Sequence, residues 1–178
     1  MKLVRWKRFT WNLKQLPPLP RPLPSHFQLR GADRSEQEPV TKLILSCLAL
    51  HNAWGDSMRL FQQRLDRHLE ALFRSQDVPA LVISHGQRII AASAIAPFPS
   101  FDNHLVSGPC VLIEYHNRGL GTVLLHSCLH RLHHMGLDQA HGVTMANATA
   151  ARFLYTKFGS TSVDCDYDAT ADEDDETH

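Results

Sequence analysis

The spacing of apolar residues along the chain predicts a succession of strands and helices. Apolar residues that recur every three or four positions predict helices over 35–50, from 56 or 57 to 73, over 123–134 and over 149–158. Short apolar or alternating runs predict strands over 26–30, 80–84, 88–95, 103–113, 140–145 and 163–167. The expected fold class is α/β (α+β), with the order β-α-α-β-β-β-α-β-α-β and a mostly antiparallel sheet. Strands 103–113 and 140–145 flank a helix, so they are expected to form one central parallel pair.

Polar residues and glycines mark the ends of several of these elements. The run Ser35-Glu36-Gln37-Glu38 offers capping side chains for the first helix. His85-Gly86-Gln87 is short enough to join the strands on either side as an antiparallel hairpin. Gly136 and Gly159 follow the last two predicted helices, where a glycine commonly ends a helix.

Charge divides the chain into three parts. The 178 residues carry no formal net charge and are enough to bury one core. We expect a basic, proline-rich arm and linker over 1–25, one folded domain over 26–168 and an acidic tail over 169–178. The arm also holds Trp6 and Trp11. We expect it to be solvated or to pack on its own domain, and an anchor to nucleic acid or to an anionic membrane is the alternative.

The cysteines and the apolar runs indicate the compartment. Cys47, Cys110, Cys128 and Cys165 are too scattered for a zinc site of the Cys-x2-Cys type, and they fit reduced thiols in a cytoplasm. No apolar run approaches the length of a membrane span, and the beginning of the chain lacks the apolar centre of a secretory signal. The chain is expected to be soluble and cytoplasmic.

A glycine-bearing loop joins a strand to a helix within residues 111–122. Gly119 and Gly121 lack the Cβ atoms that would block a phosphate, and the N–H groups at the start of the helix are free to bind an anion. The spacing matches neither a nucleoside triphosphate loop nor a dinucleotide fingerprint, which would need a third glycine at Leu124. We therefore expect a diphosphate-bearing ligand, although a Gly-x-Gly before a helix can also serve only a turn or close packing.

Two stretches resemble the GNAT superfamily of acyl-CoA-dependent N-acyltransferases. The run 111–121, Val-Leu-Ile-Glu-Tyr-His-Asn-Arg-Gly-Leu-Gly, resembles the family's Val-x-Pro-Glu-Tyr-Arg-Gly-Arg-Gly-Ile-Gly. The run 151–159, Ala-Arg-Phe-Leu-Tyr-Thr-Lys-Phe-Gly, resembles the family's Ala-x-x-Leu-Tyr-Glu-Lys-Leu-Gly. The resemblance is specific over about 107–159 and only topological before that. Three residues depart from the family pattern, namely His116, Ile113 and Ser160.

The resemblance implies an acetyl-CoA site. It places the diphosphate of the donor on the backbone N–H groups of Asn117, Arg118, Gly119, Leu120, Gly121 and Thr122. It places the pantetheine amides along the strand edge at Pro109, Cys110 and Val111. It also brings Asn147 near the pantetheine, although the residue fits an N-cap of the last helix better.

The same resemblance makes Tyr155 the general acid that protonates the leaving thiolate. No residue matches a family position for the base, and His104 is the first choice because its pKa suits neutral pH. Glu114, Asp102 and His141 are the other candidates, of which Glu114 better fits a role in the loop frame.

We expect no metal. His126, His130 and His134 repeat every fourth residue, but without a third ligand in a known motif they fit an outer helix face better than a zinc site.

The expected function is transfer of an acetyl group from acetyl-CoA to a primary amine, by direct attack in a ternary complex. The acceptor would be a small molecule or a peptide, and the chain could form a homodimer. No nucleic-acid partner is expected. The alternative from another class is a GNAT-fold module that binds acyl-CoA or a partner protein without catalysis.

Overall fold

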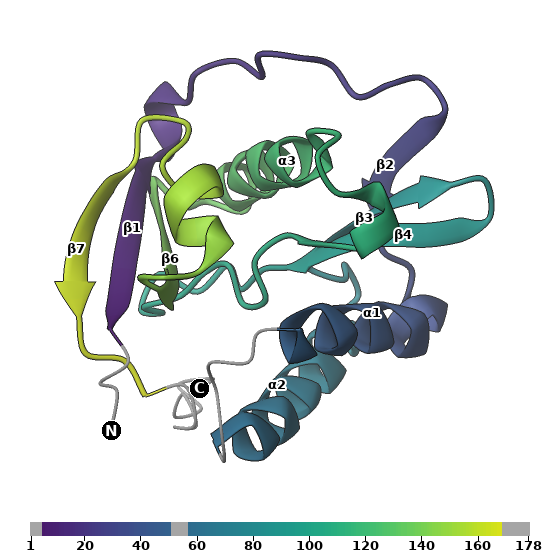
Figure 1. The fold of residues 1–178 in the computed structure, drawn as a ribbon, viewed down its shortest axis with the longest axis horizontal. Coiled ribbons are helices and arrows are strands. Elements are labelled where there is room, and N and C mark those ends of the chain that lie inside the picture. Colours follow the sequence, from purple (N-terminus) through teal and green to yellow (C-terminus); the bar gives the residue numbers. More distant parts are fainter. Residues whose placement is uncertain (1–4, 51–56, 169–178) are drawn as a thin grey trace.

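The protein was analysed as a computed structural model that describes residues 5–50 and 57–168. Two β-sheets and three α-helices make up this part of the chain, and the sheets face each other across a gap partly filled by helix α3 (Leu120–His134) (Figure 1). The architecture is mixed α/β with antiparallel sheets, as the apolar pattern predicts.

The larger sheet contains β2 (Phe27–Gly31), β3 (Ala80–His85), β4 (Arg88–Ala94) and β5 (Cys110–Val111), in that order. Alternate residues of its strands face opposite sides. Leu81 and Ile83 pack in one apolar cluster with the inner face of α3. Ala80 and Val82 pack in a second cluster with α1 (Gln37–Ala49) and α2 (Ser57–Phe73). The sheet is therefore buried between α3 and the α1–α2 pair.

The smaller sheet has an order that the sequence did not predict. Strand β1 (Trp6–Asn12) lies between β6 (Gln139–Met145) and β7 (Thr161–Cys165) and pairs antiparallel with both. The prediction of a separate arm and linker over 1–25 is therefore wrong for residues 6–15, which belong to the folded core. Phe9, Trp11 and Leu13 are almost fully buried, and their period of two marks a half-buried strand.

Basic residues around β1 meet acids of the rest of the domain. Lys7 Nζ lies 4.0 Å from Asp164 of β7, and Lys14 Nζ lies 3.4 Å from Asp138 just before β6. Such exposed pairs contribute about 0–1 kcal/mol each. Lys7 and Lys14 thus meet acids of their own domain, while the buried aromatic face of β1 holds the strand in place.

Most of the predicted elements are present within a few residues of their expected limits. Helices α1, α2 and α3 and strands β2, β3, β4, β6 and β7 are confirmed. The last predicted helix, 149–158, is instead a single π-helical turn, Ala150–Leu154, in which Tyr155 N–H donates to Ala150 O at 2.7 Å. Short 3-10 turns complete the structure at Leu13–Gln15, Arg34–Glu36 and Ile113–Tyr115.

The predicted strand 103–113 and its parallel pairing are corrected by the structure. Only Cys110 and Val111 form a strand, and every strand pair in the described residues is antiparallel. Asn103 and His104, in the loop before β5, contact β6 instead, and His104 N–H donates to His141 O at 2.8 Å. Val143 N–H donates to Asn103 Oδ1 at 3.2 Å, and His141 N–H donates to His104 Nδ1 at 2.8 Å. Since β6 is bonded to side chains here, it forms no ladder with β5.

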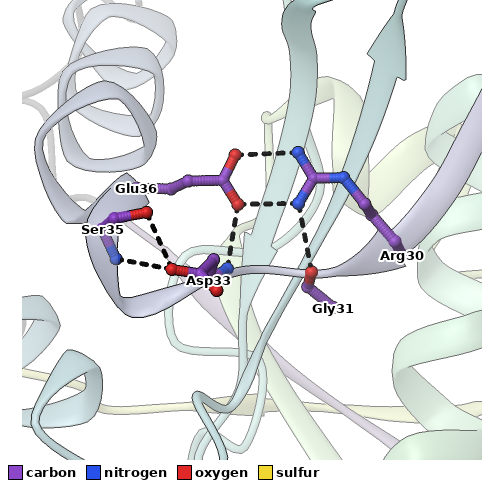
Figure 2. Close-up of polar contacts among 5 residues, drawn as sticks. All are labelled: Arg30, Gly31, Asp33, Ser35 and Glu36. Atoms are coloured by element: carbon purple, nitrogen blue, oxygen red, sulfur yellow. Dashed lines mark hydrogen bonds and ion pairs between the residues drawn. The ribbon is translucent and has the colours of Figure 1, made fainter.

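A capping box before α1 fixes how that helix leaves β2 (Figure 2). Asp33 Oδ1 accepts from Ser35 N–H at 2.9 Å, and Glu36 Oε1 accepts from Asp33 N–H at 2.9 Å. The Arg30 guanidinium of β2 donates one hydrogen bond to each carboxylate oxygen of Glu36, at 2.7 and 2.8 Å. Asp33 is the cap, two residues before the run that the sequence suggested. The bidentate hydrogen bonds from Arg30 lower the pKa of Glu36.

We predict that Glu36→Gln lowers the free energy of unfolding by about 1 kcal/mol at pH 7. Because the pKa of Glu36 is lowered in the folded state, its contribution is full above the pKa of an unfolded glutamate, about 4.3, and disappears as pH falls through the folded value. Urea unfolding at pH 7 and at pH 3 measures both effects. Glu38→Gln, an exposed change in the first turn of α1, is the control, and an equal loss in both variants at pH 7 would contradict the prediction.

Candidate active site

A cleft of about 470 Å³ opens where the two sheets separate. One wall is the segment Ser107–Val111 with the loop that leads to α3, and the other is the end of β6 with the turn after it. The inner ends of α1 and α2 close a third side. A cleft of this size matches the pockets that hold small ligands.

The start of α3 forms a cradle of N–H groups at one end of the cleft. Gly119 is the N-cap, with φ of 77° and no side-chain cap, and the first helical bond runs from Val123 N–H to Gly119 O at 3.2 Å. The N–H groups of Leu120, Gly121 and Thr122 precede that bond, so they have no acceptor within the helix. All three residues line the cleft, as does Asn117. The arrangement suits an anion such as a diphosphate.

Arg118 differs from the other predicted loop residues. Its guanidinium lies 5.1 Å from the centre of the Tyr115 ring and donates to Glu114 O at 3.3 Å. The side chain is thus turned along the outside of the loop, and Arg118 does not line the cleft. It braces the loop by a cation–π contact.

The edge of β5 faces the cleft. Leu112 N–H donates to Ile90 O on β4 at 3.0 Å, so the backbone groups of Val111 point the opposite way, toward β6. Pro109, Cys110 and Val111 all line the cleft. His116 Nε2 donates to Val111 O at 2.8 Å, which ties the loop to the strand edge.

Tyr155 lies at the floor of the cleft and is almost fully buried. Its ring makes edge contacts with Phe9 and Trp11 of β1, with centres 5.6 and 5.4 Å away. Burial, together with the neighbouring Cys110 and Cys128 thiols, raises the pKa of Tyr155 far above its usual value. The phenol therefore keeps its proton, as a general acid must.

Two glycines that the sequence analysis did not single out make room for Tyr155. Gly108 has φ of 63°, and a Cβ there would collide with the Tyr155 hydroxyl. A Cβ on Gly142 of β6 would lie 2.9 Å from Leu105, 3.1 Å from Trp11 and 3.2 Å from the Tyr155 ring. Their role depends on contacts between distant segments, which a single sequence does not display.

His104 is not available as a base, which corrects the first choice made from the sequence. It is buried, and its Nε2 donates to Phe98 O at 2.9 Å while its Nδ1 accepts from His141 N–H at 2.8 Å. A carbonyl can only accept, so the proton is fixed on Nε2 and both ring nitrogens are engaged. Burial also lowers the pKa of His104. Its role is to hold the loop before β5 against β6.

The other base candidates lie outside the cleft as well. Asp102 is 3.7 Å from Arg8, and Glu114 is 3.8 Å from Arg88, both at the surface. His141 Nδ1 is 2.9 Å from Thr10 Oγ1 on β1. Asn147 is exposed, does not line the cleft and does not cap the last helical turn, whose N-cap is Thr149. The structure brings none of the four together with Tyr155.

Helix α2 supplies four residues to the cleft, and the sequence analysis proposed no role for two of them, Arg64 and His68. Phe61, Arg64, Leu65 and His68 are spaced as one helix face, and all four line the cleft. Arg64 therefore lies on the inner face of α2. Burial and the charge of Arg64 lower the pKa of His68, so its imidazole is neutral at neutral pH. Only the 61-64-65-68 spacing could have indicated this.

Two further expectations concern metals and membranes. His126 packs on Phe158, and its Nε2 lies 3.3 Å from Nε2 of His130. Within residues 5–50 and 57–168, no group of three or more His, Cys, Asp or Glu side chains is arranged to hold a metal ion. No helix in the same part of the chain is long and apolar enough to cross a membrane.

Comparison with known proteins identifies the family. The sequence profile described as "Acetyltransferase (GNAT) family" matches residues 47–159, which include the cradle, the edge of β5 and Tyr155. The chain belongs to the GNAT acetyltransferase family. This membership supports acyl transfer in general, and members of the family generally use acetyl-CoA. No curated protein matched the chain.

Solved structures share the fold at low sequence identity. A GCN5-related N-acetyltransferase from Sphaerobacter thermophilus has a TM-score of 0.68 and 15% identity, covering 92% of this chain and 50% of its own. A GNAT-family acetyltransferase from Colwellia psychrerythraea has a TM-score of 0.64 and 14% identity, covering 91% and 54%. A GCN5-related N-acetyltransferase from Kribbella flavida has a TM-score of 0.57 and 14% identity, covering 90% and 56%. The chain thus spans about half the length of these GNAT proteins.

Two thiols meet at the wall of the cleft. Cys47 of α1 and Cys110 of β5 both line it, and Cys47 Sγ lies 3.6 Å from Val111 O. A hydrogen bond from Cys110 lowers the pKa of Cys47, and the same bond, with full burial, raises the pKa of Cys110. Burial also raises the pKa of Cys128, to about 12. The four cysteines are free, and the lowered pKa of Cys47 favours its thiolate form.

We predict that iodoacetamide alkylates Cys47 at least several-fold faster than Cys110 or Cys128, because only Cys47 combines partial exposure with a lowered pKa. Coenzyme A should slow this reaction by covering the edge of β5. Peptide mass spectrometry after timed labelling, with and without coenzyme A, measures both effects. Equal labelling of buried Cys128 would mean that the protein had unfolded, and faster labelling of Cys110 in folded protein would contradict the prediction.

Proposed function

We propose that this chain transfers an acetyl group from acetyl-CoA to a primary amine by direct attack in a ternary complex. The observation that supports this most is one cleft that joins the N–H cradle of α3, the open edge of β5 and the buried phenol of Tyr155. These parts suit a diphosphate, a chain of amides and a leaving sulfur, in that order. The residues present therefore fit acetyl-CoA.

The proposed reaction forms a C–N bond and breaks the C–S bond of the thioester. The cradle at Leu120, Gly121 and Thr122 holds the diphosphate, and Val111 offers its N–H to a pantetheine carbonyl, because its own carbonyl already accepts from His116. Tyr155 gives its proton to the departing sulfur, since its raised pKa keeps it protonated until then. His68, neutral and in the same cleft, takes the proton that the amine loses. The products are an amide and free coenzyme A.

Gly121→Asp tests the cradle, and Gly121→Asn is its matched control. A Cβ at this position meets only ordinary contacts, 3.9 Å from Leu154, and an acid in the first turn favours helix formation, so both variants should fold. We predict that Asp weakens acetyl-CoA binding at least tenfold relative to Asn, because only Asp repels the diphosphate. Calorimetric titration at two salt concentrations measures the difference, which should shrink as salt rises.

Equal acetyl-CoA affinities in the two variants would mean that the diphosphate does not bind at this end of the cleft. If wild-type protein that unfolds cooperatively gives no heat with acetyl-CoA or coenzyme A, the whole proposal is wrong. Binding without release of free thiol in the presence of an amine panel would instead favour the alternative function, a GNAT-fold module that binds acyl-CoA without catalysis.

Tyr155→Phe tests the chemistry separately from binding. The variant keeps the ring contacts with Phe9 and Trp11 and loses only the hydroxyl, so the fold and the acetyl-CoA affinity should stay nearly unchanged. We predict a fall in kcat of about 10²-fold or more, because the thiolate then leaves without its acid. Thiol release measures kcat, and a calorimetric Kd serves as the control. An unchanged kcat would mean that Tyr155 is not the general acid.

A further inference from the structure

The packing of α1 on β5 holds two thiols next to each other. Cys47 belongs to the last turn of α1 and Cys110 to β5, and both side chains line the cleft. Cys110 is part of the apolar cluster between the larger sheet and the α1–α2 pair, and Cys47 packs against the same cluster. The two sulfur atoms are therefore neighbours in the fold although 62 residues lie between them in the sequence.

The contacts of the two sulfur atoms lie on the same short stretch of backbone. Cys47 Sγ is 3.6 Å from Val111 O, which belongs to the residue after Cys110. Cys110 Sγ is 3.6 Å from Gly108 O, two residues before it. The two thiols also share a hydrogen bond with each other. A covalent bond between the sulfur atoms would therefore join groups that the fold already holds in contact.

The two thiols differ in how a dissolved oxidant can reach them. Cys47 is partly exposed and Cys110 is almost fully buried. An oxidant that enters the cleft therefore meets Cys47 first. The hydrogen bond from Cys110 lowers the pKa of Cys47, so a larger fraction of this side chain is thiolate, the form that reacts with peroxides.

The other two cysteines do not combine these properties. Cys128 is fully buried in the cluster around α3, and burial raises its pKa to about 12. Cys165 of β7 is partly exposed, but burial raises its pKa as well. Both shifts favour the thiol over the thiolate. Cys47 is thus the cysteine at which exposure, a lowered pKa and a neighbouring thiol occur together.

We propose that Cys47 is a site of oxidation by peroxides and that Cys110 is its resolving thiol, so that the pair closes a disulfide between α1 and β5 in the wall of the empty cleft. The partly exposed thiol reacts with the oxidant, and the buried thiol beside it completes the disulfide. A dithiol reductant reverses the modification.

The proposed modification has two steps. The Cys47 thiolate attacks one oxygen of hydrogen peroxide, the O–O bond breaks, and uptake of one proton gives the sulfenic acid and a first water. The Cys110 sulfur then attacks the Cys47 sulfur, so that an S–S bond forms and the S–O bond breaks. The hydroxyl group leaves with the Cys110 proton as a second water. Two thiols are thereby oxidised by two electrons in total, and one peroxide is reduced to two waters.

The same wall of the cleft is the one proposed to hold the pantetheine of acetyl-CoA. Cys110 and Val111 form the strand edge there, and Cys47 Sγ contacts Val111 O. A donor molecule along this edge covers the path from solvent to Cys47. Bound acetyl-CoA therefore protects the pair from oxidation. This protection rests on the proposed function, whereas the disulfide itself does not.

Peptide mapping of the full chain after timed exposure to hydrogen peroxide tests the disulfide. Remaining thiols are blocked with N-ethylmaleimide in denaturant, and mass spectrometry without reduction identifies the linked peptides. We expect the Cys47–Cys110 link as the main disulfide, formed at a rate independent of protein concentration and lost with dithiothreitol. Cys47→Ser should abolish this link, and Cys165→Ser, which also removes a partly exposed thiol, should leave its rate unchanged. Absence of the Cys47–Cys110 peptide from oxidised wild-type protein would overturn the proposal.

Acetyl-CoA, which has no free thiol, tests the protection. At roughly ten times its Kd it should slow formation of the link about tenfold, because only about one molecule in eleven then has an empty cleft. Gly121→Asp should lose this protection at the same acetyl-CoA concentration, and Gly121→Asn should keep more of it. An unchanged rate in wild-type protein that binds acetyl-CoA by calorimetry would overturn the protection. Protein that binds no acetyl-CoA would count against the proposed function, and the linked peptide would still decide the role of the two thiols.

Discussion

The fold depends on where two peptide N–H groups of β6 find their acceptors. His141 N–H donates to the His104 ring and Val143 N–H to the Asn103 side chain, so neither donates to a backbone carbonyl of a neighbouring parallel strand. An unpaired buried N–H would cost about 1–3 kcal/mol, and the two side chains remove that cost without closing the sheets together. The edge of β5 therefore stays open toward β6, and the cleft occupies the space. A continuous sheet at this point would leave no room for a ligand.

A second requirement links β1 to the chemistry of the cleft. Phe9 and Trp11 pack on the Tyr155 ring, and Trp11 Nε1 donates to Lys157 O at 2.8 Å, just beyond it. The π-helical turn before Tyr155 brings this residue onto the floor of the cleft instead of along a regular helix. Gly108 and Gly142 leave the phenol its space. The position of the proposed acid is thus set by four segments that are far apart in the sequence.

The sequence predicted the elements whose pattern is local and missed those set by distant contacts. Helices α1, α2 and α3, the β3–β4 hairpin and the glycine cradle follow from apolar spacing and from Gly119, all within single stretches. Strand β1 was assigned to a basic arm because charge and prolines outweighed the alternation of Phe9, Trp11 and Leu13. His104 was chosen for its usual pKa, which says nothing of the two hydrogen bonds that engage its ring. His68 lacks any motif, and only its place on the inner face of α2 brings it to the cleft.

Burial in the cleft affects the protonation of all three groups in the proposed reaction, namely the acid, the base and the amine. Burial in the cleft disfavours the charged forms of Tyr155 and of His68. For Tyr155 the charged form is the phenolate, so the acid keeps its proton. For His68 it is the imidazolium, so the base is free to accept one. For the bound amine it is the ammonium, so the nucleophile reacts as the neutral amine. Burial therefore favours the reactive forms of the proposed acid and base, and the charge of Arg64 adds to this effect for His68.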